Sequence, residues 1–368
     1  MMNKMIVSNL AHRPVRSLIS IAAIALEVTL ILLIVGLSLG MLNDSRSRQA
    51  GIGADVIVLP PGSSAIVGLT GAPMPIKIGD VLARLPHVSI VSPVLMQIST
   101  AGALQTIYGI DLPTFAAMRP FNFLKGGPFQ GSNDILVDDI YANAKHARVG
   151  DSVELFNHTF RISGIVLHGK GARLFLPLTT LQELNGATAR ASAFYVKADD
   201  PSNADTVVGE IKQVRGMSTG YGVYSMREYL TMITPDNYPG FSTFIRIVIG
   251  ISVTIGFIVI FQAMYAAVME RTREIGILKS LGASKLYIVN VILRETTLLA
   301  IGGIVVGIAI SFTAKAGIHQ RVPTLPVQMH LDWVIRATLI AIVGALGGAI
   351  YPAFKAAQKD PIDALAYE

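Results

Sequence analysis

The chain has 368 residues, of which 52% are hydrophobic and 15% charged, and its mean hydropathy is +0.55. Soluble domains average about 25% charged residues, so this composition excludes an ordinary soluble protein and indicates membrane-spanning helices. The formal net charge is +6, which in a membrane protein is typical of basic cytoplasmic loops rather than of a nucleic-acid partner. The chain has no cysteine, which excludes disulfides, thiolate metal sites and a cysteine nucleophile.

Four stretches are long and apolar enough to span a bilayer, which takes about 20 helical residues. Residues 17–43 carry one charged side chain, Glu27, and residues 247–269, 296–314 and 337–354 carry none. The first stretch is nearly twice as long as the apolar region of a signal peptide, which spans about 7–15 residues. We therefore expect it to be an uncleaved membrane anchor.

The residues between the first two stretches are numerous enough for a separate domain. Short runs rich in β-branched residues predict strands at 54–60, 134–139, 151–156, 159–167 and 193–198. Helices are predicted at 78–86, 177–186 and 203–214, the second of them with Thr179 or Thr180 as N-cap and Gly186 as its stop.

These patterns predict an α-helical membrane protein with four transmembrane helices and an α/β extracytoplasmic domain inserted between helices 1 and 2. Lys and Arg near the helix ends are more numerous on the side of the termini, which places both termini in the cytoplasm. The predicted parts are an amphipathic helix with transmembrane helix 1 (1–43), the extracytoplasmic domain (44–240), transmembrane helix 2 (241–269), a cytoplasmic segment (270–287), transmembrane helix 3 (288–314), a short extracytoplasmic loop (315–331), and transmembrane helix 4 with the cytoplasmic tail (332–368).

The stretch "GIVLHGKG", Gly164 to Gly171, is similar to a phosphate-binding P-loop. Gly171 stands where that motif needs Ser or Thr to hold Mg²⁺, and no helix pattern follows. A Gly-rich hairpin between the strand at 159–167 and "ARLFLP" is the preferred interpretation. No catalytic motif and no cluster of metal ligands is found, so neither catalysis nor a metal site is predicted for this chain.

The segment "MERTREIGILKSLGASK" places many charges between two uncharged stretches. A helix is predicted from Glu270 to Leu281, with pairs Glu270–Arg273 and Arg271–Glu274 at i,i+3 spacing. Gly282 is expected to end this helix, and Ser284 to cap the next one.

Ile277, Leu278 and Leu281 fall on one side of this predicted helix, which makes it amphipathic. Such a helix can dock a soluble partner, or it can lie on anionic lipid headgroups through its basic residues. The residues of this segment do not distinguish docking of a soluble partner from binding to lipid headgroups.

The segment from Met269 into transmembrane helix 3, "MERTREIGILKSLGASKLYIVNVILRETTLLAIGGIVVGIAIS", resembles the signature of FtsX/MacB-type (type VII) ABC transporter permeases. "NLAHRPVRSLISIAAIALEV" (9–28) resembles the family's entry helix and first span, and "YPAFKAAQKDPIDALAYE" (351–368) its terminal motif. The stretch "ILVDDIYANAKHARVGDSVELFNHTFRISGIV" is more loosely similar to the family's MacB-like periplasmic domain.

The resemblance implies a subunit of the bacterial cytoplasmic (inner) membrane that works with a separate cytoplasmic ABC ATPase and a second permease copy, identical or paralogous. ATP and Mg would be bound by that ATPase, with no cofactor in this chain, which has neither a P-loop nor room for an ATPase domain. A periplasmic adaptor is a further candidate partner. By position, the residues that would meet the ATPase in the family's coupling helix are Glu270, Arg271, Arg273, Glu274, Ile277, Leu278, Lys279, Leu281, Gly282 and Ala283.

Glu27 is the one charge within the first span, where an ionised carboxylate costs at least about 2.5–3.5 kcal/mol. The leading hypothesis is a polar contact that supports pairing of two permease copies. A proton-linked site, or a protonated or snorkelling carboxyl, are the alternatives.

The function that follows from the resemblance is mechanotransmission, in which ATP hydrolysis by the partner moves the extracytoplasmic domain. The large domain favours export or extraction of a periplasmic or membrane-embedded substrate. The alternatives are an FtsX-like signalling subunit that regulates an extracytoplasmic partner such as a cell-wall hydrolase, and Lol-like handling of lipoproteins or lipids.

Overall fold

The computed structural model describes residues 14–63, 72–99, 105–217, 220–237 and 240–358. They form two compact units, each described here by itself. A helical unit comprises the chain up to Leu39 together with Gly240–Gln320 and the chain from Val327 onward. A sheet unit comprises Gly40–Pro239 and Arg321–Pro326.

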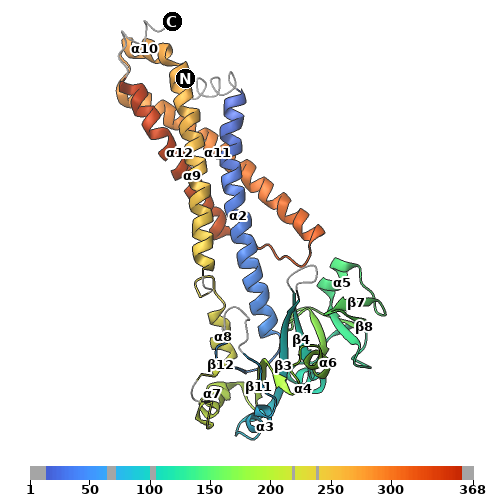
Figure 1. The fold of residues 1–368 in the computed structure, drawn as a ribbon. Helices are drawn as coiled ribbons and strands as arrows, with labels where there is room; N and C mark the ends of the chain where they lie inside the picture. Colours follow the sequence, from blue (N-terminus) through green and yellow to red (C-terminus); the bar gives the residue numbers. More distant parts are fainter. Residues whose placement is uncertain (1–13, 64–71, 100–104, 218–219, 238–239, 359–368) are drawn as a thin grey trace. The chain divides into compact units, whose positions relative to one another are not determined.

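The four predicted transmembrane helices are confirmed as long apolar helices. Each extends beyond its uncharged stretch, because polar residues at the ends continue the helix. The predicted loop at 315–331 is therefore shorter, since helix covers its residues up to Arg321. The helices of this unit are α2 (Pro14–Ala50, whose last part lies in the sheet unit), α9 (Phe241–Glu270), the short α10 (Thr272–Ser280), α11 (Lys285–Arg321) and α12 (Leu331–Gln358) (Figure 1).

Glycines let these helices approach closely, as expected for membrane bundles. A Cβ added at Gly303 of α11 would lie 2.6 Å from Ile24 Cβ of α2, and one at Gly348 of α12 would lie 2.8 Å from the Phe257 carbonyl oxygen of α9. The bundle core is completed by a row of buried alanines along α12.

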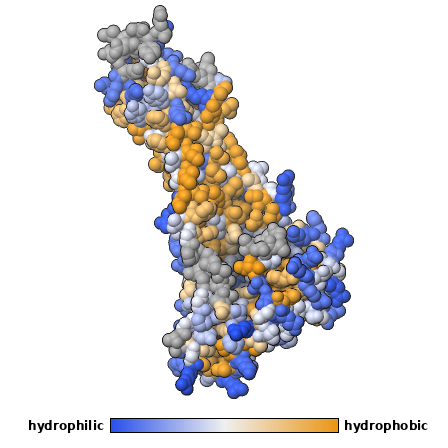
Figure 2. Space-filling model, in the orientation of Figure 1, coloured by the Kyte–Doolittle hydropathy of each residue, from blue (hydrophilic) through white to orange (hydrophobic). Residues whose placement is uncertain are grey.

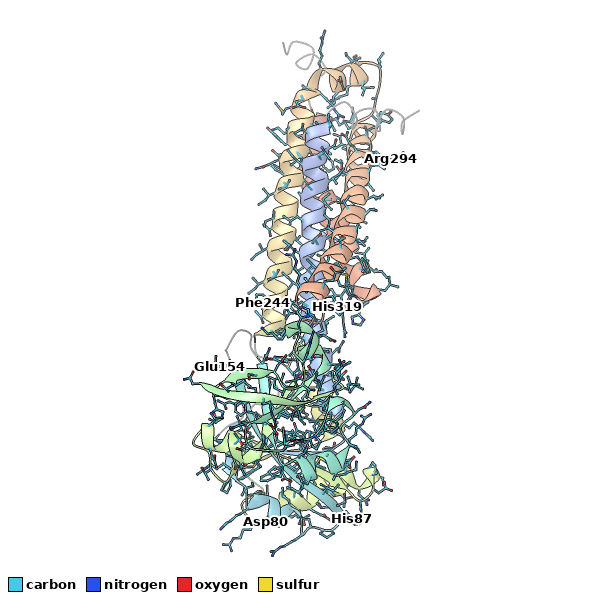
Figure 3. All side chains as sticks on the ribbon, turned by 90° about the vertical axis from the view of Figure 1, so that its right-hand side faces the viewer. Asp80, His87, Glu154, Phe244, Arg294 and His319 are labelled. Atoms are coloured by element: carbon cyan, nitrogen blue, oxygen red, sulfur yellow. The ribbon has the colours of Figure 1, made fainter. Side chains whose placement is uncertain are left out.

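One face of α9 carries large apolar side chains that are about half exposed. They recur every three or four residues, so they form one stripe along the helix. Figure 2 shows that apolar side chains cover much of this unit's surface, and Figure 3 labels the first residue of the stripe. A stripe of this kind suits contact with lipid or with another membrane helix. The stripe consists of Phe244, Ile247, Ile251, Ile255 and Ile258.

The sheet unit contains a ten-stranded mixed sheet in the order β12-β1-β11-β3-β4-β9-β6-β8-β5, with β7 paired to β8. The pairs β4–β9 and β6–β8 are parallel, and the other pairs of this sheet are antiparallel. The strands are β1 (Val56–Leu59), β2 (Met74–Pro75), β3 (Val88–Ser99), β4 (Gln105–Ile110), β5 (Phe123–Gly126), β6 (Asp134–Asp138), β7 (Ser152–Leu155), β8 (His158–Val166), β9 (Leu174–Pro177), β10 (Arg190–Ala191), β11 (Ala193–Ala198) and β12 (Gly222–Ser225).

Helices cover this sheet, with α4 and α3 against β3, α6 against β4, and α7 and α8 against β12. Among the described residues of this unit, one hydrophobic cluster lies around Phe160 and Leu174 and another around Val58 and Phe194. The helices are α3 (Ile78–Leu82), α4 (Leu112–Met118), α5 (Asp139–Lys145), α6 (Leu178–Leu184), the 3₁₀ turn η1 (Pro201–Asn203), α7 (Ala204–Gln213) and α8 (Met226–Met232).

The predicted α/β domain is confirmed, with every predicted strand and helix present, but two local predictions are wrong. The N-cap position of α6 is Pro177, and Thr180 instead donates to the Ser132 carbonyl oxygen at 2.9 Å. The expected hairpin between β8 and β9 does not form, because β6 lies between them.

The P-loop-like stretch begins with the end of β8 and continues as a loop, residues 167–171, against which the end of α2 packs. Lys170 of this loop is buried, donates to the Arg119 carbonyl oxygen and lies 4.3 Å from the centroid of the Phe121 ring. The Gly171 N–H donates to the Arg48 carbonyl oxygen at 2.7 Å. Burial lowers the pKa of Lys170 to about 8, since a desolvated ammonium is disfavoured. The loop thus serves packing within the sheet unit.

A buried ion pair lies beside this loop. Arg173 donates to Asp138 at 3.0 Å and to Asp44 of α2 at 3.1 Å, and the Tyr141 N–H donates to Asp138 at the start of α5. Burial raises the pKa of Asp138 to about 6, against the lowering effect of Arg173. The charged carboxylate is therefore less favourable in the folded state than in the unfolded chain.

The raised pKa of Asp138 gives the stability of the sheet unit a testable pH dependence. Its folded pKa exceeds its unfolded value, so the contribution of Asp138 is fully present below about pH 4 and is lost as pH rises through about 6. We expect the stability of Asp138→Asn relative to the unaltered chain to rise between pH 4 and pH 7.5, because asparagine does not titrate. Thermal unfolding of both chains in detergent across this range measures the difference, and a gap that widens toward acid pH would refute it.

Candidate functional site

The candidate site is the turn region between α9 and α11, in the helical unit. Helix α9 ends at Glu270, Arg271 leaves helical geometry, and α10 follows at once. Figure 1 shows α10 at the end of the bundle where α9 finishes and α11 begins.

Two caps hold the turn after α10, and both agree with the sequence prediction. Gly282 has φ of +94°, its N–H donates to the Lys279 carbonyl oxygen, and the Ala283 N–H donates to the Leu278 carbonyl oxygen, both at 3.0 Å. This is a Schellman motif, which needs a left-handed residue and so favours glycine. Ser284 then accepts from the Tyr287 N–H at 3.2 Å and caps α11.

One side of α10 packs inward. Thr272, Ile275 and Gly276 are buried, and Leu278 packs against the bundle core. Lys279 donates through Nζ to the Ala357 carbonyl oxygen of α12 at 3.0 Å. Four of the ten predicted docking residues therefore serve to hold α10 on the bundle: Arg271, Leu278, Lys279 and Ala283.

The other side of α10 is exposed in the single chain. Leu281 is 79% exposed and Leu286, at the start of α11, is 77% exposed. Together with Ile277 and Tyr287 they make an exposed apolar group, which we name the apolar tip. Such a patch is typical of a contact with a protein or with a membrane surface. The other six predicted docking residues are exposed: Glu270 at the end of α9, which pairs with Arg16, and Arg273, Glu274, Ile277, Leu281 and Gly282.

Charged residues of the turn pair with residues of other helices. The predicted pair between Arg271 and Glu274 is therefore wrong. The Arg271 guanidinium donates to both carboxylate oxygens of Glu295 in α11, at 2.9 and 3.0 Å, instead of pairing with Glu274. Arg16 of α2 lies 3.3 Å from Glu295 and 3.5 Å from Glu270. We name these four residues the ion cluster.

Sequence reasoning did not select Glu295, Arg16, Leu286 or Tyr287 for this site. Glu295 did give a signal, because it is an acid directly before the uncharged stretch at 296–314. Arg16 gave none beyond the general excess of basic residues near the helix ends. Pairing between residues 279 positions apart becomes visible only once the helices are packed.

Glu27 lies inside the bundle of its own chain. It is 3% exposed, and a Cβ added at Gly256 of α9 would lie 2.1 Å from its Oε2, while one at Gly344 of α12 would lie 3.7 Å from its Oε1. Oε1 has no hydrogen-bond partner. Within the single chain the side chain therefore packs against α9 and α12. A role in pairing two copies stays a prediction.

Two family descriptions match the chain. Residues 17–214 match the MacB-like periplasmic core domain, and residues 246–361 match the FtsX-like permease C-terminal domain. Both halves of the predicted resemblance are thereby confirmed.

Curated relatives are ABC transporter proteins. The uncharacterized ABC transporter permease YknZ of Bacillus subtilis is 30% identical over 60% of this chain and 55% of its own length. The macrolide export ATP-binding/permease protein MacB of Sodalis glossinidius is 24% identical over 97% of this chain and 59% of its own length. The chain thus spans little more than half the length of the curated relatives it matches.

Two solved structures are similar to part of the chain. The periplasmic region of MacB from Actinobacillus actinomycetemcomitans is 16% identical, with a TM-score of 0.40, and covers 50% of this chain and 94% of that one. The extracellular domain of YknZ is 14% identical, with a TM-score of 0.37, and covers 46% of this chain and 99% of that one.

The two matches together cover most of the chain, and its four long apolar helices and permease family point to an integral protein of the inner membrane. The chain belongs to the family with a MacB-like periplasmic core domain and is an ABC transporter permease of the MacB/YknZ/FtsX-like type.

Proposed function

We propose that this permease works with a separate cytoplasmic ABC ATPase, which docks on α10 and drives movement of the extracytoplasmic sheet unit. The output is export or extraction of a periplasmic or membrane-embedded substrate, and ATP and Mg are bound by the ATPase. Two permease copies and two ATPases form the working complex.

The observation that carries this proposal is the apolar tip. It combines two leucines that are more than three-quarters exposed with a helix that is capped and anchored on the bundle. An exposed apolar group on a rigid support can bury its area against a partner without first losing much conformational freedom. The charged side chains beside the tip, Arg273 and Glu274, suit the polar rim of such a contact.

The proposal requires both termini and α10 on the cytoplasmic side. Because the chain has no native cysteine, single introduced cysteines report topology without background labelling. A cysteine in place of Ser280 is expected to react with an impermeant maleimide only after the cells are opened, whereas one in place of Ser132 is expected to react in intact spheroplasts. The reverse pattern would invert the orientation.

Docking is tested with Leu281→Asp combined with Leu286→Asp. Burying a leucine is worth about 1.5–3 kcal/mol, so loss of both is expected to weaken ATPase binding at least tenfold. Binding of a candidate partner ABC ATPase is measured by titration against the permease in nanodiscs. Leu331→Asp is the matched control, because Leu331 is 75% exposed but begins α12, away from α10.

Unchanged affinity in the double variant would contradict docking on α10. Headgroup binding, the other use of an amphipathic helix, makes a different prediction. A fluorophore on a cysteine at position 281 would then be quenched by lipids that carry a nitroxide on the headgroup. If α10 docks the ATPase instead, quenching by the lipid nitroxide is expected to be weak. Added ATPase is then expected to protect the fluorophore from a quencher dissolved in the water.

A further inference from the structure

Glu295 is a buried acid at the meeting point of three helices. Its side chain is 3% exposed, and it lies in α11 just where this helix enters the uncharged stretch. A carboxylate in such a place is stable only when charges and hydrogen bonds surround it. Arg271 and Arg16 supply them, at 12% and 13% exposure.

Arg271 links Glu295 to the start of α10. It is the one residue between α9 and α10, and its guanidinium meets the carboxylate through two parallel hydrogen bonds. This bidentate geometry fixes direction as well as distance, which a lysine could not do. The N-terminal end of α10 is therefore tied to α11.

Arg16 links the same carboxylate to α2. It stands in the first turn of this helix and lies between Glu295 and Glu270. Helix α2 is the element whose chain continues without a break to Ala50, within the sheet unit. The ion cluster thus joins the base of α10 to the helix that leads to the extracytoplasmic domain.

An open cavity lies beside the ion cluster, between α10 and the facing turns of α9 and α11. Its volume is ≈ 290 Å³, and its lining is mostly apolar. Ile275 and Leu278 line it together with Ile277 and Tyr287 of the apolar tip, and Arg271 and Glu295 of the ion cluster border it as well. Helix α10 is therefore tied to α11 at its start and to α12 through Lys279, with open space beside it.

We propose that Glu295 is a positioning residue that makes the ion cluster a pivot, so that tilting of α10 into or out of the cavity turns the start of α2. The proposal rests on docking of an ATPase at α10, as argued above. It assigns different tasks to two groups of residues: the apolar tip receives the partner, and the ion cluster passes the movement on.

The test uses Glu295→Gln in the full chain, which keeps the side-chain shape and removes the charge. Because the chain has no cysteine, spin labels can be placed on cysteines introduced at Leu18 of α2 and Ser280 of α10, both exposed. The distance distribution between the labels in nanodiscs needs no ATPase. We expect one narrow distance in the otherwise unaltered chain and a distribution at least twice as wide in Glu295→Gln.

The second measurement separates movement from binding. With the ATPase present, Glu295→Gln is expected to keep its binding affinity within about threefold, a small free-energy change. Stimulation of ATP hydrolysis by the permease is expected to fall at least tenfold. A merely structural role would lower both together, or lower only the melting temperature.

Two further variants serve as a control and as a second test. Arg294→Gln changes the neighbouring residue, which is exposed, is labelled in Figure 3 and bonds Asn290 of its own helix, so it is expected to match the unaltered chain in every measurement. Arg271→Lys keeps the charge but loses the bidentate contact, and is expected to widen the distance distribution to an intermediate degree. It also tests the pivot if Glu295→Gln fails to fold.

A distribution in Glu295→Gln and Arg271→Lys as narrow as in the unaltered chain would overturn the pivot. Loss of ATPase binding in proportion to loss of stimulation would also overturn it. Failure of the proposed function itself looks different, because the ATPase would then not bind even the unaltered chain.

Discussion

Gly256→Ala is expected to destabilise the helical unit by about 1–3 kcal/mol, the range for overpacking a filled core. The added Cβ would lie 2.1 Å from Oε2 of Glu27 and 2.9 Å from its Cδ. A carboxylate end can often move aside, but this one is 3% exposed and is also enclosed by Gly344 of α12. The clash therefore has no easy relief within the packed bundle.

Removing the carboxyl group of Glu27 should abolish most of the stability loss that Gly256→Ala causes. In a Glu27→Ala background the expected cost of Gly256→Ala is below about 0.5 kcal/mol, because neighbouring residues in contact are not additive. Thermal unfolding of the four chains in one detergent gives the coupling. Gly250→Ala is the control on the same helix, since a Cβ there meets no atom within 4 Å. Additive effects of the two changes would show that Glu27 does not pack against Gly256.

The same pair of residues shows what the sequence could predict. The absence of charges was enough to find the four membrane helices, because lipid excludes charge over a fixed length. It also marked Glu27 as unusual. It could not indicate which way the side chain faces, because that depends on helix rotation, which is set by contacts such as Gly256 and Gly344 in helices more than 200 residues away.

For the sheet unit, local sequence patterns predicted the positions of strands and helices better than they predicted which strands pair. The strands at 134–139 and 159–167 are present, yet their pairing was missed, because insertion of β6 between β8 and β9 is a non-local event. The long strand β3 was missed as well. Buried and exposed residues do not alternate regularly along β3, so its sequence lacks the period-two pattern that predicts a strand.

For the candidate site, capping signals worked because they are local. Gly282 and Ser284 act as predicted, since a left-handed turn and an N-cap each depend on a few adjacent residues. The pairing of Arg271 was not predictable in the same way. Its partner at i+3 was available, but a buried carboxylate at Glu295 demands compensation more strongly than an exposed Glu274 does.

Gly51→Ala is expected to cost the sheet unit at least about 3 kcal/mol, more than most single substitutions. A Cβ at this position would lie 1.6 Å from the Gly169 carbonyl oxygen and 2.8 Å from its carbon. Both atoms belong to the backbone, so relief requires the loop at 168–171 to move. That movement would also break the hydrogen bond from the Gly171 N–H to the Arg48 carbonyl oxygen.

The expected result is a lower melting temperature and faster cleavage of the sheet unit by added protease, measured on the full chain in detergent. Gly209→Ala is the matched control: Gly209 lies within α7 with no atom within 4 Å, so alanine there should leave stability equal or raise it by about 0.5–1 kcal/mol. A Gly51→Ala chain as stable as that control would mean that α2 does not end against this loop. Helix α2 runs from the ion cluster to this loop. Gly51→Ala should therefore loosen the packing of the C-terminal end of α2 against the sheet unit. ATPase docking at the apolar tip, which lies at the other end of the helical unit, should be unchanged.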